Sequence, residues 1–234
     1  MTTAAKPYEM PFTRVELAVL SLVGGRLCVL LGRRAQAPHA GRWALPGGVL
    51  RIDLDNNLED AAQRTARERL GTGLPFVRQL VTVGTKTRDP RAPWSLAIVY
   101  RALLPAESFK PVAGKRLEEL RWVPADSAAA DGQLAFDHAK LIALAVEVTR
   151  AETEQLLLPA GFLPESFTLG ELQQTCEEIL GQPLDKSSFR RKLSDRGLVE
   201  PVAGEMRGGA NRPAQVYRLT NQMRGRRDPS LLPQ

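Results

Sequence analysis

The sequence predicts an α+β fold in two parts, a layered α/β/α domain followed by a small domain that ends in a β-hairpin. Up to about residue 158, stretches rich in β-branched and aromatic residues alternate with one short and one long segment of helical spacing. Pro159, Gly161 and Pro164 then interrupt the pattern and mark the best domain boundary. Beyond them the order is helix, turn, basic helix, strand, glycine-rich loop and strand, which is that of a winged helix-turn-helix.

The first domain is expected over residues 13–158, after a loose arm at residues 1–12. RVELAVLSLV and LCVLL are apolar runs around a Gly-Gly turn, which is typical of a hairpin. Residues 58–70 have apolar side chains near helical spacing, and Gly71 follows as a helix-ending residue. FVRQLVTVGT, WSLAIVYRALL and ELRWVPAD are expected to be strands, the last running into a turn. A long helix is predicted over residues 136–158.

The second domain is expected over residues 159–220, before a basic and disordered tail at residues 221–234. Thr168 and Glu171 have the spacing of a capping box at the start of TLGELQQTCEEIL. Asp185 is expected to cap a second helix, DKSSFRRKLSDRG, whose Phe189 and Leu193 point inward at i,i+4 spacing. The helix-turn-helix therefore has a clear start signal for each of its two helices.

The composition is that of a folded globular protein, with 43% hydrophobic and 25% charged residues among 234. No run of 18 apolar residues occurs, and the first residues do not resemble a secretory signal. Cys28 and Cys176 have no cysteine or histidine at metal-ligand spacing, so we expect two buried thiols in a reducing compartment. These observations predict a cytoplasmic protein without a membrane span.

The charge is distributed unevenly along the second half of the chain. Residues 151–185 contain seven acidic residues and no basic one, whereas residues 186–227 contain eleven basic and three acidic residues. A solvated basic tail would have such a composition. A sharp change of sign inside one small domain favours a face that meets a polyanion such as nucleic acid.

The segment WALPGGVL and the helix that ends before Gly71 resemble the box of the Nudix family, G-x5-E-x7-R-E-U-x-E-E-x-G-U. In that family, glutamates on one helical face hold a divalent metal ion beside a diphosphate. The match places Arg64 at the arginine, Thr65 at the first helix glutamate, Glu68 at the second and Arg69 at the last. Asn56 takes the upstream glutamate position, and the box glycine is reached only by allowing two extra residues.

The loss of these carboxylates has a chemical consequence. Mg²⁺ prefers clustered oxygen ligands, and one carboxylate beside a cation attracts a diphosphate but repels the metal ion. We therefore predict a domain that binds a diphosphate without cleaving it: it is not an enzyme, has no catalytic or metal-binding residues, and requires no cofactor. The later segments RDPRAPWSLAIVYRALL and LAFDHAKLIALA, with Phe136, Asp137 and His138, resemble the ADP-ribose-related branch of the family.

The second domain carries a further resemblance. LDKSSFRRKL and the segment GGANRPAQVYR are similar to the Nudix-related transcriptional regulators of NAD metabolism, the NrtR group, over about residues 12–220. The resemblance implies a repressor whose Nudix domain senses ADP-ribose or a related nucleotide and whose winged helix binds operator DNA. A sister branch with the same architecture is associated with pentose utilisation, so the effector stays open between these classes. A winged helix of this size usually reads paired half-sites, which predicts a homodimer.

Two sets of side chains are candidate contacts. The DNA-binding set lies on the second helix, where side chains reach base edges and phosphates, and on the wing; it comprises Lys186, Ser187, Ser188, Arg190, Arg191, Lys192, Arg207 and Arg212. The ligand-binding set lies in segments expected to converge on the Nudix cleft; it comprises Arg33, Arg34, Trp43, Arg51, Arg64, Glu68 and Arg88. Trp43 is a candidate for stacking on a base, and a core position is the alternative.

Two other functions remain open from the sequence. The first is a metal-dependent ADP-ribose or nucleoside-diphosphate pyrophosphatase with an accessory nucleic-acid-binding domain. It would need ligands outside the helix, such as Asp53 or Asp55. The second is an adaptor whose basic helix is a solvated face and does not bind DNA.

Overall fold

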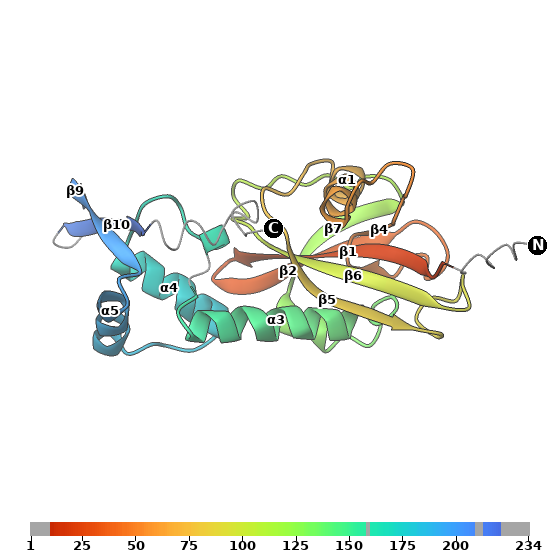
Figure 1. Cartoon of the computed structure of the whole chain (residues 1–234). Coiled ribbons are helices and arrows are strands. Elements are labelled where there is room, and N and C mark those ends of the chain that lie inside the picture. The colour runs from red at the N-terminus through yellow and green to blue at the C-terminus, as the bar shows by residue number, and fades with distance from the viewer. Residues whose placement is uncertain (1–9, 158–159, 209–212, 221–234) are drawn as a thin grey trace, which may run out of the picture.

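The computed structural model describes residues 10–157, 160–208 and 213–220 (Figure 1). A large mixed sheet lies between helices, and a smaller unit with its own sheet lies beyond one end of it. The predicted α/β/α sandwich and winged helix are both present. The predicted boundary between residues 158 and 159 and the tail at 221–234 fall outside the described residues. The first described strand begins at Phe12, the last residue of the predicted arm.

The large sheet is built around its first strand. β1 (Phe12–Val23) pairs in parallel with β6 (Ser95–Leu103) and antiparallel with β2 (Arg26–Arg34). The remaining strands are β3 (Trp43–Ala44) and β7 (Leu117–Pro124) on β2, β4 (Gly47–Val49) on β1, and β5 (Arg78–Thr85) on β6. The β1–β2 turn uses Gly24 and Gly25 at positive φ, as the Gly-Gly pair predicts.

One helix covers each face of this sheet (Figure 1). α1 (Leu58–Leu70) packs its alanines and Leu70 against one face, and α3 (His138–Glu154) packs Leu141, Ile142 and Ala145 against the other. The nearly continuous apolar run of β1 follows from this arrangement, because both of its faces are buried.

The predicted limits of α1 are confirmed. Asn57 caps its first turn by accepting a hydrogen bond from the Asp60 amide, and Gly71 ends it at φ +70°. Gly48 on β4 lies directly on this helix: a Cβ at that position would be 2.7 Å from the Thr65 hydroxyl. Gly48 is therefore required by close packing of strand on helix, whereas Gly47 lies against residues of β1.

Two details of the first domain differ from the prediction. The long helix begins at His138 because Phe136 has φ +55°, and it ends at Glu154, before Leu156 at φ +55°. The turn expected after ELRWVP is a short helix, α2 (Ala125–Ala129). Its Ala125 and Ala128 are buried in the core beneath α3.

The second unit is a winged helix. After a 3-10 turn (Ala160–Phe162) come β8 (Phe167–Thr168), α4 (Leu169–Leu180), α5 (Lys186–Asp195), β9 (Val199–Arg207) and β10 (Ala214–Leu219). The Thr168 capping box and the Asp185 cap are both confirmed. Phe189 and Leu193 are buried as predicted. The two-residue strand β8, which pairs with β10, was not predicted because it is too short to show alternation.

The two units share a packed contact rather than only a connecting segment. Ile179, on the last turn of α4, is completely buried in the core between the large sheet and α3. Arg150 of α3 donates to the Ile179 carbonyl oxygen and binds both carboxylate oxygens of Asp126 on α2. Arg196, after α5, donates to the Gln155 carbonyl oxygen at the end of α3.

Both cysteines are free and buried, as predicted. Burial raises the pKa of the Cys176 thiol to about 12, so it stays protonated. Within the described residues, no helix is both long and apolar enough to cross a bilayer.

Candidate functional site

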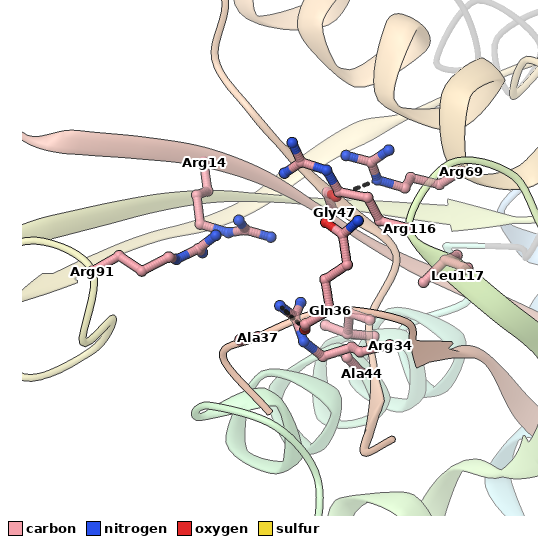
Figure 2. A pocket seen from close by; sticks show the side chains of 11 residues that line it. Arg14, Arg34, Gln36, Ala37, Ala44, Gly47, Arg69, Arg91, Arg116 and Leu117 are labelled. Carbon is pink, nitrogen blue, oxygen red and sulfur yellow. Dashed lines mark hydrogen bonds between the residues drawn. The ribbon is translucent and has the colours of Figure 1, made fainter. Parts of the chain in front are cut away.

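An open cleft lies where β1, the end of β2, α1 and the loops that carry Gln36, Arg91 and Arg116 meet, and its empty volume, with the solvent at its mouth included, is about 430 Å³. Figure 2 shows that guanidinium groups surround it. We call it the arginine pocket and define it by five arginines that line it, Arg14, Arg34, Arg69, Arg91 and Arg116. No aspartate or glutamate is among its lining residues, so the cavity is suited to an anion.

Arg69 belongs to the pocket because of its place on the last turn of α1. Its Nε donates to the Gly47 carbonyl oxygen at 2.8 Å, and its Nη1 donates to the Lys115 carbonyl oxygen at 3.0 Å. Burial lowers the pKa of Arg69 from its usual value, and the nearby carboxylate of Glu68 opposes that shift. The side chain is therefore held rigidly at the position of the last glutamate of the Nudix pattern.

Arg116 is brought to the pocket by a loop that caps α1. The amides of Val112, Gly114 and Lys115 donate to the last free carbonyl oxygens of this helix. A Cβ on Gly114 would lie 2.2 Å from the Glu68 carbonyl oxygen, so only glycine permits this approach. The next turn places Arg116 at φ +63°, an unusual backbone conformation for a non-glycine residue.

The close approach of the pocket arginines affects their pKa values. Burial, with repulsion from Arg14 and Arg91, lowers the pKa of Arg34 to about 10. Burial also lowers the pKa of Arg14, although Glu16 partly opposes the shift. Arg34 stacks on the ring of Phe136, with its central carbon 5.0 Å from the ring centroid. A bound anion would relieve the repulsion between these cations.

A buried ionic network lies beside the pocket. Arg88 Nη2 is 2.6 Å from Glu16 Oε2 and 2.9 Å from Asp137 Oδ1. His138 Nδ1 accepts a hydrogen bond from the Leu45 amide, and its Nε2 lies 3.1 Å from Glu16 Oε2. Burial alone would raise the pKa of Glu16, but His138, Arg88 and Arg14 outweigh it and hold the pKa well below the usual value.

The fold implies a divalent metal on α1, and the residues present do not fit one. Thr65 is completely buried against Gly48, where its hydroxyl cannot replace a carboxylate. Glu68 has Arg64, Arg69 and Lys115 within 3.6 to 3.7 Å of its carboxylate. A divalent cation at this helix would meet three positive side chains around one negative group.

One other group, Glu16 with Asp137 and His138, has ligand atoms close enough to hold an ion. Its space is already taken, because the Arg88 guanidinium binds both carboxylates and the Leu45 amide engages His138. This group is a structural ionic network, and the metal implied by the fold does not fit here either.

The seven predicted ligand-binding residues do not all lie at the arginine pocket. Of these, only Arg34 lines the arginine pocket. Glu68 lies beside it through its contact with Arg69. Arg88 does not face an open cleft, because it is 7% exposed and bound in the ionic network. The prediction for Arg88 is therefore corrected: its charge is already neutralised inside the protein.

The remaining four residues are engaged elsewhere. Arg33 is within 3.1 Å of Glu118 and Arg51 pairs with Asp53 in the exposed loop after β4. Arg64 binds both oxygens of Asp55 and the Val49 carbonyl, which ties that loop to α1. Trp43 is half-buried against the core and stacked under Arg121, which favours the core alternative over base stacking.

Four pocket arginines were not in the predicted ligand-binding set. One is Arg69, which the sequence analysis assigned only to a position of the altered Nudix box; the other three are Arg14, Arg91 and Arg116. They come from a strand, a loop and a strand start that are far apart in sequence. The only local signals were Arg14 two residues before the acidic Glu16 in an otherwise apolar strand, and the Arg-rich loop RDPRAP. Neither signal indicates on which side of the sheet these arginine side chains lie.

The predicted DNA-binding residues on α5 form an exposed surface. Lys186, Ser187, Arg190, Arg191 and Lys192 are exposed, and Ser188 is half-buried beside the Asp185 cap. Among the residues that the structure describes, the four cations of this helix make no ion pair. Helical rotation places Ser187 and Arg191 opposite the buried Phe189 and Leu193. This free basic face has the chemistry of a phosphate and base contact surface.

Of the two predicted DNA-binding residues of the wing, only Arg207 lies in the described part of the chain. Arg207, at the end of β9, is exposed and binds both carboxylate oxygens of Glu171, the capping-box residue of α4. It therefore lies at the base of the wing, tied to the first helix of the motif. Arg212 lies outside the described residues.

Comparison with known proteins supports the assignment of both domains, the α/β/α domain and the winged helix. The NUDIX domain family matches residues 13–145, and the NrtR DNA-binding winged helix domain matches residues 159–219. The ADPR responsive transcriptional repressor NtrR of Acinetobacter baylyi is 36% identical over 215 residues, which are 92% of this chain and 84% of that protein.

Solved structures show the same two-part architecture. The NrtR of Shewanella oneidensis complexed with a 27mer DNA has 32% identity and a TM-score of 0.75, covering 90% of this chain and 94% of that one. Its NUDIX domain complexed with ADP ribose has 30% identity and a TM-score of 0.56, covering 63% and 94%. A MutT/nudix family protein from Enterococcus faecalis has 25% identity and a TM-score of 0.74, covering 93% and 90%.

The family matches cover both domains, and the relative from A. baylyi is similar along almost the whole chain. The altered Nudix helix, the arginine pocket and the basic α5 are found together in one molecule. The chain belongs to the NrtR family of Nudix-related transcriptional regulators.

Proposed function

We propose that this protein is a transcriptional repressor that binds ADP-ribose in the arginine pocket and operator DNA with α5 and the wing. The names of its relatives support the proposal: one is an ADPR responsive repressor, and others were crystallised with DNA or with ADP ribose. From the family resemblance we expect genes of NAD metabolism to be the targets.

The observation that carries the proposal is the charge of the pocket. Five arginines line it, and Arg34 and Arg116 have no carboxylate partner among the residues described. The diphosphate of ADP-ribose offers oxygen acceptors for such donors, and guanidinium groups bind phosphate through paired hydrogen bonds. Gln36, also in the lining, offers an amide for a sugar hydroxyl.

The ligand half is tested by calorimetric titration of the full chain with ADP-ribose. Replacing Arg116 by alanine removes one charged hydrogen-bond donor and should weaken binding by about tenfold or more. Arg26→Ala is the control, because Arg26 is exposed at the start of β2 and outside the pocket. Equal affinity of all three proteins would contradict the assignment of the pocket.

The DNA half is tested by binding to a duplex from the gene's own upstream region at several salt concentrations. Arg191→Ala should weaken binding and, if Arg191 contacts a phosphate, lower the slope of log K against log salt by about one. Lys140→Ala, an exposed cation on α3, should change neither value. An unchanged Arg191→Ala affinity would favour the adaptor function.

We further infer that the protein does not hydrolyse ADP-ribose. Glu68 is surrounded by cations, and the two aspartates that could replace it are engaged, Asp53 by Arg51 and Asp55 by Arg64. Incubation with ADP-ribose and Mg²⁺ or Mn²⁺ should release no AMP. Rapid release that disappears in Glu68→Gln would establish the pyrophosphatase alternative.

Assembly and location follow from the same proposal. A repressor that reads paired half-sites acts as a homodimer, in which the two α5 helices are about 34 Å apart or a multiple of that distance. We propose that it works in the cytoplasm, where its DNA is. Sedimentation of the free protein and of the DNA complex would measure the number of subunits in each.

A further inference from the structure

We propose that the arginine pocket binds its diphosphate effector as the metal-free anion, and that Arg69 takes the place of the divalent cation used by metal-dependent Nudix proteins. This inference rests on the proposed function and adds to it the ionic form of the effector. Metal-dependent members need Mg²⁺ to neutralise the diphosphate. Here the protein supplies that positive charge itself.

The charge balance of the pocket supports the metal-free form. Three of its arginines have a carboxylate partner: Arg14 pairs with Glu16, Arg69 contacts Glu68, and Arg91 binds both oxygens of Asp89. The fourth and fifth, Arg34 and Arg116, have none among the described residues. Glu16 is also shared with Arg88, and Glu68 with Arg64 and Lys115. The pocket therefore carries more positive charge than its carboxylate partners cancel, and this excess can neutralise the two negative charges of a diphosphate diester without a metal ion.

The geometry of Arg69 supports its role as the replacement. Two of its three nitrogens are used by the backbone carbonyls of Gly47 and Lys115, which fixes the guanidinium plane. The side chain lines the cavity from the helix that would otherwise hold the metal. Figure 2 shows both the Arg69 and the Arg116 guanidinium groups at the upper edge of the pocket. Together they offer a diphosphate fixed donors without a cation to be bound first.

The chemistry predicts an unusual response to Mg²⁺. A diphosphate that has bound Mg²⁺ has lost its net negative charge, and the cation would add to a pocket already crowded with arginines. Mg²⁺ should therefore not assist binding. This is the opposite of the behaviour expected where glutamates line the helix.

The first test is calorimetric titration of the full chain with ADP-ribose, in EDTA and in millimolar MgCl₂ at equal ionic strength. We expect the affinity in EDTA to equal or exceed the affinity in MgCl₂. Affinity raised about tenfold or more by Mg²⁺ would overturn the inference and leave the proposed effector intact. Failure to bind in both buffers would overturn the proposed function as well.

The second test uses inorganic pyrophosphate as a simpler probe of the same pocket. In EDTA it should displace ADP-ribose, because it offers the same phosphate oxygens with more charge. In excess MgCl₂ it should displace ADP-ribose much less well, because the magnesium complex is the poorer ligand. Stronger displacement in MgCl₂ than in EDTA would contradict the inference.

The third test changes the replacing residue. Arg69→Glu should weaken ADP-ribose binding in EDTA by about a hundredfold, because it exchanges a cation for an anion beside the phosphates. MgCl₂ should restore part of this loss, since the new carboxylate and Glu68 can together ligate the cation. Arg69→Gln should weaken binding in EDTA without any recovery in MgCl₂.

Arg67→Glu is the matched control for the change of charge. Arg67 is exposed on the same helix, two residues earlier, and does not line the pocket. The affinity of this variant for ADP-ribose should stay within about twofold of that of the original protein in both buffers. Operator binding without effector verifies that each variant is folded. A folded Arg69→Glu protein that binds ADP-ribose normally in EDTA would refute the role of Arg69.

Discussion

Glu16 is the residue on which the ionic network beside the arginine pocket depends. It is completely buried and contacts Arg14 on the same strand, together with Arg88 and His138 from two segments distant in sequence. Removing one partner of such a group leaves the other charges buried and uncompensated, which is more costly than the pair itself is worth. Arg88 also binds Asp137, so Glu16 holds the loop after β5 and the start of α3 together.

Glu16→Gln should therefore lower the free energy of unfolding at neutral pH by about 3 kcal/mol. The control is Glu107→Gln, an exposed glutamate that should change stability by less than about 0.5 kcal/mol. Urea unfolding of the three proteins measures the difference. A loss as small as that of the control would show that the network is not stabilising.

The same residue predicts a response to acid. Because the folded pKa of Glu16 lies well below its usual value, the unfolded chain binds its proton first as the pH falls. The stability that Glu16 contributes is therefore complete at neutral pH and decreases from about pH 5 downward. Urea midpoints of the original protein should fall over this range, and those of Glu16→Gln should fall less.

At the scale of elements, α5 combines a stable start with a free surface. Asp185 accepts a hydrogen bond from the Ser188 amide, and Phe189 and Leu193 fix one side of the helix in the core. The capping residue thus orders the turn that carries Lys186, Ser187 and Ser188, the part of a recognition helix nearest the bases. The stability of that turn and the affinity for DNA are linked.

Asp185→Ala should cost about 1 kcal/mol of stability and weaken operator binding. Asp185→Asn is the informative partner, since asparagine caps a helix about as well as aspartate and removes one negative charge near the DNA. We expect this variant to keep its stability and to bind DNA at least as tightly as the original. If Asp185→Ala bound the operator as tightly as the original protein, the helix cap would not contribute to DNA recognition.

At the scale of the whole molecule, α3 connects the two functional surfaces (Figure 1). It begins at His138, in the network beside the pocket, and its end lies against the winged helix, where Arg196 binds the Gln155 carbonyl. Arg150, three turns along, holds both α2 and the end of α4. A shift of α3 on effector binding would therefore move the winged helix with it.

Arg150→Ala should reduce the factor by which ADP-ribose changes the affinity for the operator, because it removes a contact that joins the two units. Neither binding site contains Arg150, so the affinity for each ligand alone should change little. Operator binding with and without saturating ADP-ribose measures the factor, and Lys140→Ala on the same helix is the control. An unchanged factor would place the coupling elsewhere.

The sequence by itself determined the order of the longer helices and strands, the caps at Asp185 and Thr168, and the cation at position 69. These features are local: a cap, a turn or a family motif is written in a few neighbouring residues. The fold class and the family resemblance followed from them. The set of ligand residues did not, and only Arg34 of the predicted seven lines the pocket.

Only the tertiary structure decided which charges meet. Arg14, Arg91 and Arg116 reach one cavity because the register of β1, the loop after β5 and the loop before β7 aims them there. Arg88 and Arg91 lie in the same short loop, and one is bound inside the protein while the other faces the cavity. Sequence spacing cannot distinguish them, because an arginine's partner depends on side chains that folding brings from far along the chain.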